Sequence, residues 1–143
     1  MALFSKDRIL VPTDFSEASL TAIKETVAFA DSGANVYALY VLKSLEATDP
    51  GMVWDTVNSE QRRENVMKLF LENFPPESYA GLNFAVEEGD PSAEIIDYAK
   101  NHNIGLIVMP SRGRTGISRF FMGSTAERVV KLATCPVLVV NES

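Results

Sequence analysis

The chain contains few of the residues that form disulfides and metal sites. Its 143 residues include one cysteine, Cys135, and one histidine, His102. A single cysteine excludes an intrachain disulfide, and these two residues cannot supply the ligand spacing of a zinc site. We therefore expect a cytoplasmic protein without a metal site, in which Cys135 packs in the interior and His102 lies on the surface.

Long apolar runs are missing as well. No stretch approaches the roughly 20 apolar residues that cross a bilayer, and residues 1–7 lack the apolar core of a secretion signal. A basic surface is also missing, because the formal net charge is -6. Proteins that bind nucleic acid use a basic face to neutralise phosphates. We expect no membrane segment and no nucleic-acid partner.

Three signatures of enzymes are absent. The sequence contains no G-x-x-x-x-G-K-[ST] phosphate loop, no G-x-G-x-x-G dinucleotide fingerprint and no G-x-S-x-G nucleophile elbow. No residue stands out as a catalytic base either. These absences favour a binding protein over an efficient enzyme.

Short apolar runs alternate with segments of helical period along the chain. With 46% hydrophobic and 22% charged residues, residues 1–143 are expected to form a single domain. The alternation is typical of a parallel sheet covered by helices, an α/β fold. Strands are predicted at 9–11, 36–42, 82–86, 105–109 and 137–140, and helices at 16–31, from 58 or 59 to 74, 90–101 and 124–132.

Local signals mark the ends and faces of these elements. Ser16 is expected to cap the first helix, Gly33 to mark its stop, and Asp90-Pro91 to open the third helix. The last strand lies so near the C-terminus that it must be an edge or pair outside its own chain. The second helix is expected to bury Val66, Phe70 and Phe74, and the last helix Val129, Val130 and Leu132.

The loop before the last helix is rich in glycine and arginine. Between Pro110 and Met122 there are three arginines and no acid, namely Arg112, Arg114 and Arg119. Ser124 and Glu127 have the spacing of a capping box, which predicts a helix start at Ser124. Because free amides and the macrodipole at a helix start hold anions, the loop favours an oligophosphate ligand.

Four segments resemble those of one known family. They are Val11-Pro12-Thr13-Asp14-Phe15-Ser16, Tyr40-Val41, Glu88-Gly89-Asp90-Pro91 and Pro136-Val137-Leu138-Val139-Val140. The family's nucleotide signature is G-2x-G-9x-G-[S/T], and Gly113, nine residues and then Gly123-Ser124 fit its latter part. Over nearly its full length the chain resembles a small single-domain universal stress protein of the nucleotide-binding type. One departure is Pro110, which stands where the signature has its first glycine and removes an N–H donor there.

The resemblance implies a fold, a ligand and an assembly. The implied fold is a doubly wound sheet of five parallel strands in the order 3-2-1-4-5, adenine nucleotide alpha hydrolase-like, with helices on both faces. The implied ligand is ATP, alone or with Mg²⁺, over the carboxyl ends of the strands, where open α/β sheets generally bind ligands. The implied assembly is a homodimer formed by antiparallel pairing of Val137–Val140, which would protect an apolar edge. The implied function is regulation in a stress response, with at most slow ATP hydrolysis.

The resemblance also implies the residues of the site. Asp14 would meet the adenine or ribose edge, and Val41 would offer backbone contacts to the base. Gly113, Gly123, Ser124 and Thr125 would surround the phosphates. The complete candidate set is Pro12, Thr13, Asp14, Val41, Met109, Ser111, Gly113, Arg114, Gly123, Ser124 and Thr125.

Other interpretations of the same residues stay open. Ser124 could serve as a helix cap alone, and Asp14 could serve only to support the start of the first helix. The loop could stay empty in a nucleotide-free dimer that acts through protein interactions, which Pro110 favours. A phospho-accepting receiver domain is a third possibility, because Asp14 follows the first strand. It is disfavoured, since no acidic pair stands there and Glu87-Glu88-Gly89 ends the third strand without an aspartate.

Overall fold

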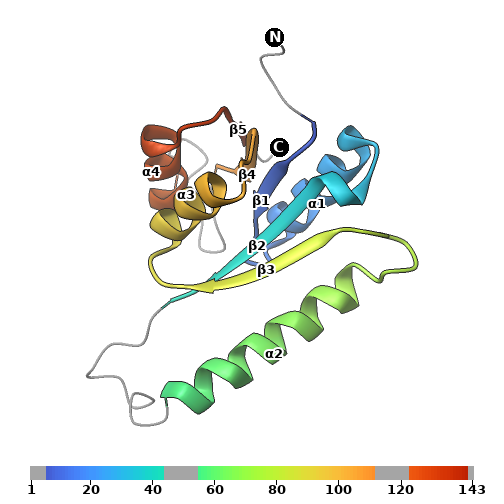
Figure 1. Cartoon of the computed structure of the whole chain (residues 1–143), viewed down its shortest axis with the longest axis vertical. Coiled ribbons are helices and arrows are strands. Elements are labelled where there is room, and N and C mark those ends of the chain that lie inside the picture. Colours follow the sequence, from blue (N-terminus) through green and yellow to red (C-terminus); the bar gives the residue numbers. More distant parts are fainter. Residues whose placement is uncertain (1–5, 44–54, 112–122, 142–143) are drawn as a thin grey trace.

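The computed structural model describes residues 6–43, 55–111 and 123–141 (Figure 1). Strands and helices alternate along these residues, as the sequence predicts. The strands are β1 (Ile9–Pro12), β2 (Val36–Leu42), β3 (Asn83–Glu88), β4 (Leu106–Pro110) and β5 (Val137–Val140). The helices are α1 (Glu17–Ala30), α2 (Asp55–Asn73), α3 (Pro91–Asn101) and α4 (Ser124–Leu132), with a short 3-10 helix, η1 (Gly33–Asn35).

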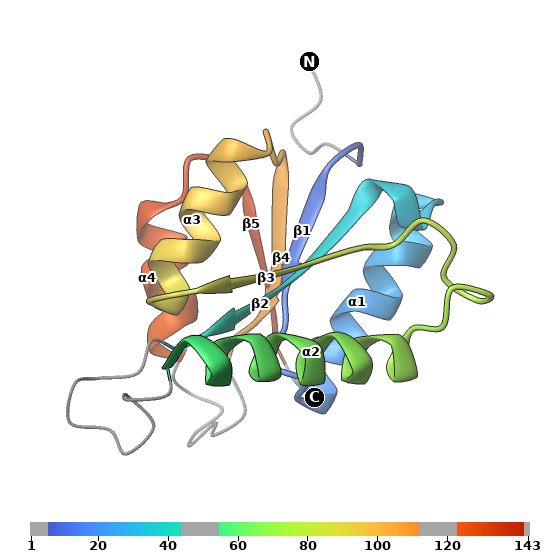
Figure 2. The ribbon, with the colours of Figure 1, turned by 60° about the horizontal axis from the view of Figure 1, so that its bottom comes forward.

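The five strands form one parallel sheet in the order β3-β2-β1-β4-β5. Helices α1 and α2 cover one face of the sheet, and α3 and α4 cover the other (Figures 1 and 2). The predicted α/β fold and strand order are therefore confirmed. The last strand is an edge of the sheet within this chain, as its position near the C-terminus predicted.

Two hydrophobic cores lie on the two faces of the sheet. Ile9 and Val11 of β1 point into the core beneath α1 and α2, whereas Leu10 points into the core beneath α3 and α4. Successive strand residues face opposite sides, so a strand buried on both faces needs an uninterrupted apolar run. This requirement explains why β1 is apolar at every position from Ile9 to Val11.

Helix α2 packs through aromatic residues at four-residue intervals. Val66, Phe70 and Phe74 are buried as predicted, and the Phe70 ring stacks on Phe84 of β3 with centroids 4.0 Å apart. The helix begins at Asp55, so the start predicted at residue 58 or 59 is three or four residues late. Residues 44–54, which connect β2 to α2, lie outside the described part of the chain.

Helix α1 begins as predicted but ends differently. The Ser16 hydroxyl accepts the Ser19 N–H at 3.2 Å, which confirms the N-cap. The helix ends at Ala30, and Asp31 takes the left-handed conformation with φ 65°, so Gly33 is not the C-cap. Gly33 has a packing role instead, because a Cβ atom there would lie 2.7 Å from the Ala80 carbonyl oxygen.

Helix α4 lies toward the β5 edge of the sheet and buries less than predicted. Ala126 and Val129 are buried, but Val130 is 43% exposed and Leu132 is 61% exposed. The prediction that Val130 and Leu132 are buried is therefore wrong. A helix near a sheet edge has packing neighbours on one side only, so apolar residues on its outer side face solvent. No helix among the described residues has the length and hydropathy needed to cross a bilayer.

Candidate functional site

A cleft of about 570 Å³ opens at the carboxyl ends of the central strands. It lies where β1 has β2 on one side and β4 on the other, which is the point where the strand order reverses. Ligands of open α/β sheets bind at this crevice, because connections leave β1 and β4 toward opposite faces. The cleft is bounded by the N-terminal ends of α3 and α4, since Pro91 and Ser124 both line it.

The fold brings most of the predicted site residues together. Those that line the cleft are Pro12, Thr13, Asp14, Val41, Met109, Ser111, Gly123, Ser124 and Thr125. They come from three strands and from the start of α4. Gly113 and Arg114 lie outside the described residues, as do Arg112 and Arg119. Contact of these residues with a nucleotide stays a prediction.

The turn after β1 is held by a network of hydroxyl and carboxylate groups. The Asp14 Oδ1 atom accepts the Ser16 N–H at 2.9 Å and the Ser19 hydroxyl at 3.2 Å. Ser19 also lies 2.8 Å from the Thr13 hydroxyl, and Phe15 has a φ of 61°. Asp14 therefore supports the start of α1 while it lines the cleft. A bulky residue with positive φ persists only where surrounding contacts hold it, so this turn is preorganised.

The start of α4 differs from the predicted capping box. Gly123 is the N-cap, its carbonyl accepts the Glu127 N–H at 3.0 Å, and no side chain of the described residues caps the helix. The Glu127 carboxylate lies on Lys131 at 3.0 Å instead of reaching back to the cap. Ser124 is thus the first helical residue, and the prediction that it is the cap is wrong. The first amides of a helix have no partner within it, so this end presents donors toward the cleft.

A short backbone bond fixes where α4 begins. The Gly123 N–H donates to the Ser111 carbonyl at 2.7 Å, and the Ser111 N–H donates to Val140 of β5 at 2.9 Å. Ser111 directly follows β4, so the helix start is attached to the carboxyl end of a central strand. The segment Gly123–Thr125, which the resemblance implies as part of the phosphate site, is therefore anchored to the sheet at Gly123.

Pro110 removes a donor from the cleft without disturbing the sheet. Since the neighbouring Ser111 N–H points to Val140 of β5, the backbone nitrogen of residue 110 points toward β1. Described pairing between β1 and β4 ends at Leu10 and Ile107, before this position. Proline is tolerated where its nitrogen faces no strand partner. The departure from the signature is thus compatible with the fold and acts on the cleft.

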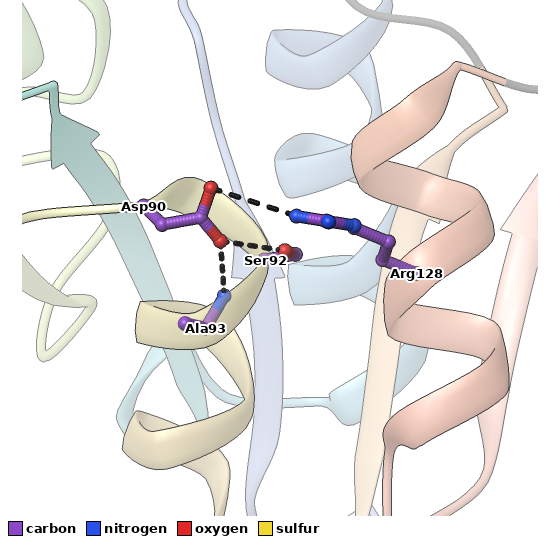
Figure 3. Close-up of polar contacts among 4 residues, drawn as sticks. All are labelled: Asp90, Ser92, Ala93 and Arg128. Carbon is purple, nitrogen blue, oxygen red and sulfur yellow. Dashed lines mark hydrogen bonds and ion pairs between the residues drawn. The ribbon is translucent and has the colours of Figure 1, made fainter.

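An ion pair joins the two helices whose starts border the cleft (Figure 3). Asp90 caps α3: its Oδ2 accepts the Ser92 hydroxyl at 2.8 Å and the Ala93 N–H at 3.1 Å. Its Oδ1 lies 3.8 Å from the Arg128 guanidinium of α4. The Ser92 and Ala93 hydrogen bonds, with smaller contributions from Arg128 and Lys43, lower the pKa of Asp90. The carboxylate therefore stabilises the relative position of α3 and α4.

Replacing Asp90 by alanine is expected to lower the free energy of unfolding by about 1 kcal/mol at neutral pH, through loss of the cap. A carboxyl group with a lowered folded-state pKa stabilises the fold above its unfolded pKa, and this stabilisation is lost as the pH falls through the folded pKa. Urea unfolding at pH 7 and pH 3 should thus show a smaller difference at pH 3. Asp97→Ala, which removes another exposed α3 carboxylate, is the control. An equal loss of unfolding free energy in both variants would contradict the capping role.

The sequence interpretation missed Lys43 and Arg62, which also line the cleft. Together with Asp14 they are the charged residues of the cleft in the described ranges. A signal for Arg62 was present, because it precedes Val66, Phe70 and Phe74 by the same four-residue step and so extends the buried face of α2 by one turn. A cationic residue that continues the buried apolar face of a helix is unusual. It indicates that an interaction partner of this residue lies near the helix start.

Cys135 is half-buried and packs against the core beneath α3 and α4. Burial raises the pKa of the Cys135 thiol, so the group stays protonated at neutral pH. This placement fits the predicted packing role. His102 ends α3 and stacks on Tyr98, with ring centroids 3.8 Å apart. It is half-buried rather than fully on the surface, because this stacking covers one ring face.

The chain has relatives among known proteins. The sequence profile of the Universal stress protein family matches residues 6–141. Universal stress protein MJ0531 from Methanocaldococcus jannaschii is 36% identical over 141 residues, which cover 94% of this chain and 82% of that protein. The structure of universal stress protein UspA from Lactobacillus plantarum has a TM-score of 0.73 at 32% identity, over 99% of this chain and 100% of that chain.

A further solved structure is a universal stress protein in complex with cAMP. It has a TM-score of 0.61 at 18% identity and covers 99% of this chain and 100% of that chain, so it shows the same fold. The profile match extends over nearly every residue, and the strand order and the position of the cleft agree with the resemblance noted in the sequence. The chain therefore belongs to the universal stress protein family.

Proposed function

We propose that this protein binds ATP in the cleft and acts as a dimeric regulatory module of the stress response. The observation that carries the proposal is the placement of the α4 start at one end of a cleft that extends across β4, β1 and β2. A nucleotide has an anionic end and a flat, mostly apolar end. The cleft offers matching environments for both.

The end formed by α4 suits the phosphates. Gly123, Ser124 and Thr125 line the cleft at the helix N-terminus, where the positive end of the macrodipole attracts anions. Two hydroxyl groups add donors beside the backbone amides. The Ser124 hydroxyl does not serve as the helix cap, because the N-cap residue is Gly123.

The end formed by β2 suits the base. Leu39 and Val41 of β2 line the cleft there together with Ile95 of α3, and Leu39 and Ile95 are buried. Flat apolar walls with a few polar groups are typical of small-molecule sites, and a volume of about 570 Å³ is within their usual range. The cAMP complex of another protein with this fold supports an adenine nucleotide in particular.

The apolar edge strand supports the dimer. Leu138 is 52% exposed and Val140 is 36% exposed on β5. With Phe29 of α1 they line an apolar groove of about 390 Å³ on the face of the sheet that carries α1. A second copy that pairs its β5 with this one would satisfy the backbone groups of the edge and cover the groove.

The cleft favours regulation over catalysis. Its charged residues in the described ranges are Asp14, Lys43 and Arg62. Asp14 already accepts two hydrogen bonds that support α1, and the other two are cations. A general base must have a free acceptor within reach of the attacking water. We propose at most slow hydrolysis of ATP, with occupancy rather than turnover as the signal.

A nucleotide-free interaction protein is the second candidate. Pro110 favours it, because the proline removes a donor on the side of β4 that faces the cleft. In this case the dimer surface would carry the function and the cleft would stay empty.

Calorimetric titration of the purified protein separates the two candidates. We expect saturable binding of ATP with one site per chain, in the presence or absence of Mg²⁺. Titrations with GTP and with inorganic triphosphate measure the contributions of the base and the phosphates. Flat titrations with ATP, ADP, AMP and cAMP at millimolar concentration would overturn the proposal in favour of the nucleotide-free candidate.

A further inference from the structure

Arg62 has an unusual environment at the β2 end of the cleft. It lies on α2, one turn before the buried face that Val66, Phe70 and Phe74 form. Its side chain is half-buried and lines the cleft, close to the end of β2. In contrast, the neighbouring Arg63 is exposed and donates to the Val86 carbonyl at 2.7 Å.

One terminal nitrogen of Arg62 is hydrogen-bonded, and the other has no partner among the described residues. Nη2 donates to the Lys43 carbonyl at 3.0 Å, just after β2. Nη1 is buried and has no hydrogen-bond partner among the described residues. A buried donor without an acceptor is unfavourable, most of all when it belongs to a charged group.

The order of the strands places this nitrogen far from the phosphate end. Arg62 is held at the end of β2, whereas Gly123 is bonded to the end of β4, with β1 between them. Neighbouring strands lie about 4.8 Å apart, so the two ends of the cleft are separated by roughly 10 Å. Val41, at the end of β2, lines the cleft on the Arg62 side. If the α4 start holds the phosphates, Arg62 faces the base.

We propose that Arg62 determines ligand specificity by donating a hydrogen bond from its guanidinium to an acceptor atom of the base. The inference rests on the proposed nucleotide-binding function and assigns a residue to its base end. A guanidinium only donates and keeps its proton at all accessible pH values. The group at this position must therefore be a ring nitrogen or a carbonyl oxygen. An exocyclic amine there would leave the guanidinium without an acceptor.

Arg62→Met tests the assignment, since methionine keeps much of the apolar stem and removes every donor. Arg63→Met is the matched control on the next residue, outside the cleft. Titrations with adenosine, AMP, ATP and inorganic triphosphate then separate base contacts from phosphate contacts. We expect about 10- to 100-fold weaker binding of adenosine, AMP and ATP alike for Arg62→Met, the range for a hydrogen bond from a charged donor. Binding of triphosphate should be unchanged, and Arg63→Met should bind every ligand as the wild type does.

The outcomes are distinguishable. If the wild type binds neither adenosine nor ATP, the proposed function fails and this inference fails with it. If the wild type binds and Arg62→Met binds adenosine equally well, the inference alone is overturned. If the loss of affinity in Arg62→Met grows with the number of phosphates on the ligand, Arg62 contacts the phosphates and the inference is overturned. If Arg62→Met does not fold, Arg62→Gln replaces it in the same titrations. Glutamine keeps a polar side chain without the charge.

Discussion

Replacing Gly123 by valine is expected to weaken ATP binding by at least about 100-fold. Gly123 has φ -65° and ψ 156°, an extended conformation that valine also adopts, so the fold should persist. The new side chain would stand in the cleft lining, beside the amides at the start of α4. Loss of two hydrogen bonds to a charged ligand, each of about 1.5–3 kcal/mol, accounts for a factor of this size.

The control for Gly123→Val is Ala28→Val, which places the same valine side chain on the exposed side of α1, away from the cleft. Calorimetric titration gives the ATP dissociation constant of each variant, and circular dichroism checks that both are folded. ATP binding that is unchanged in a folded Gly123→Val protein would show that the start of α4 does not hold the phosphates.

Replacing Leu138 by aspartate is expected to convert the proposed dimer to monomers at micromolar concentration. Leu138 is 52% exposed on β5 and lines the apolar groove beside α1. In the proposed dimer this residue lies at the interface, where an unpaired carboxylate would have to lose its water. We expect the dimer dissociation constant to rise by at least about 100-fold. Analytical ultracentrifugation over a concentration series measures this constant.

A second variant tests the pairing of β5 itself. The carbonyl of Val140 accepts from Ser111 of β4, so the alternate residue Val139 directs its N–H to the outer edge. Val139→Pro removes this outer donor and leaves the bonds to β4 in place. It should also yield monomers if the strands pair across the interface.

Leu71→Asp is the control for the dimer variants, because it places the same charge on an exposed leucine of α2, which packs beside β3 at the opposite edge of the sheet. It should remain dimeric. A wild-type protein that sediments as a monomer at every concentration would refute the dimer. A Leu138→Asp protein that dimerises as tightly as the wild type would refute this interface.

Local signals predicted the elements and several of their ends. The Ser16 and Asp90 caps and the apolar step from Val66 to Phe74 depend on neighbours a few residues away, and the structure confirms them. The wrongly predicted cap of α4 also concerns neighbouring residues. Gly123 and Ser124 are adjacent, and Gly123 is the N-cap because its backbone is extended and the helix begins at Ser124.

Burial and the cleft depended on contacts that the sequence pattern does not contain. Val130 and Leu132 have the residue type of a core position, but α4 lies near the edge of the sheet and exposes them. Arg62 has the residue type of a surface position, yet the path of α2 brings it to the end of β2, beside Lys43. In both cases the neighbours in space, and not the residue type, decided the environment.

The sequence by itself determined the alternation of strands and helices, because that alternation follows from the period of apolar residues along a single segment. It also placed Pro12, Asp14 and Gly123 at the ends of elements, where a parallel sheet gathers its functional residues. Only the tertiary structure decided that Arg62 faces the same cleft as Gly123. Segments distant along the chain meet there because the sheet orders its strands by packing and hydrogen bonding, and not by their order in the sequence.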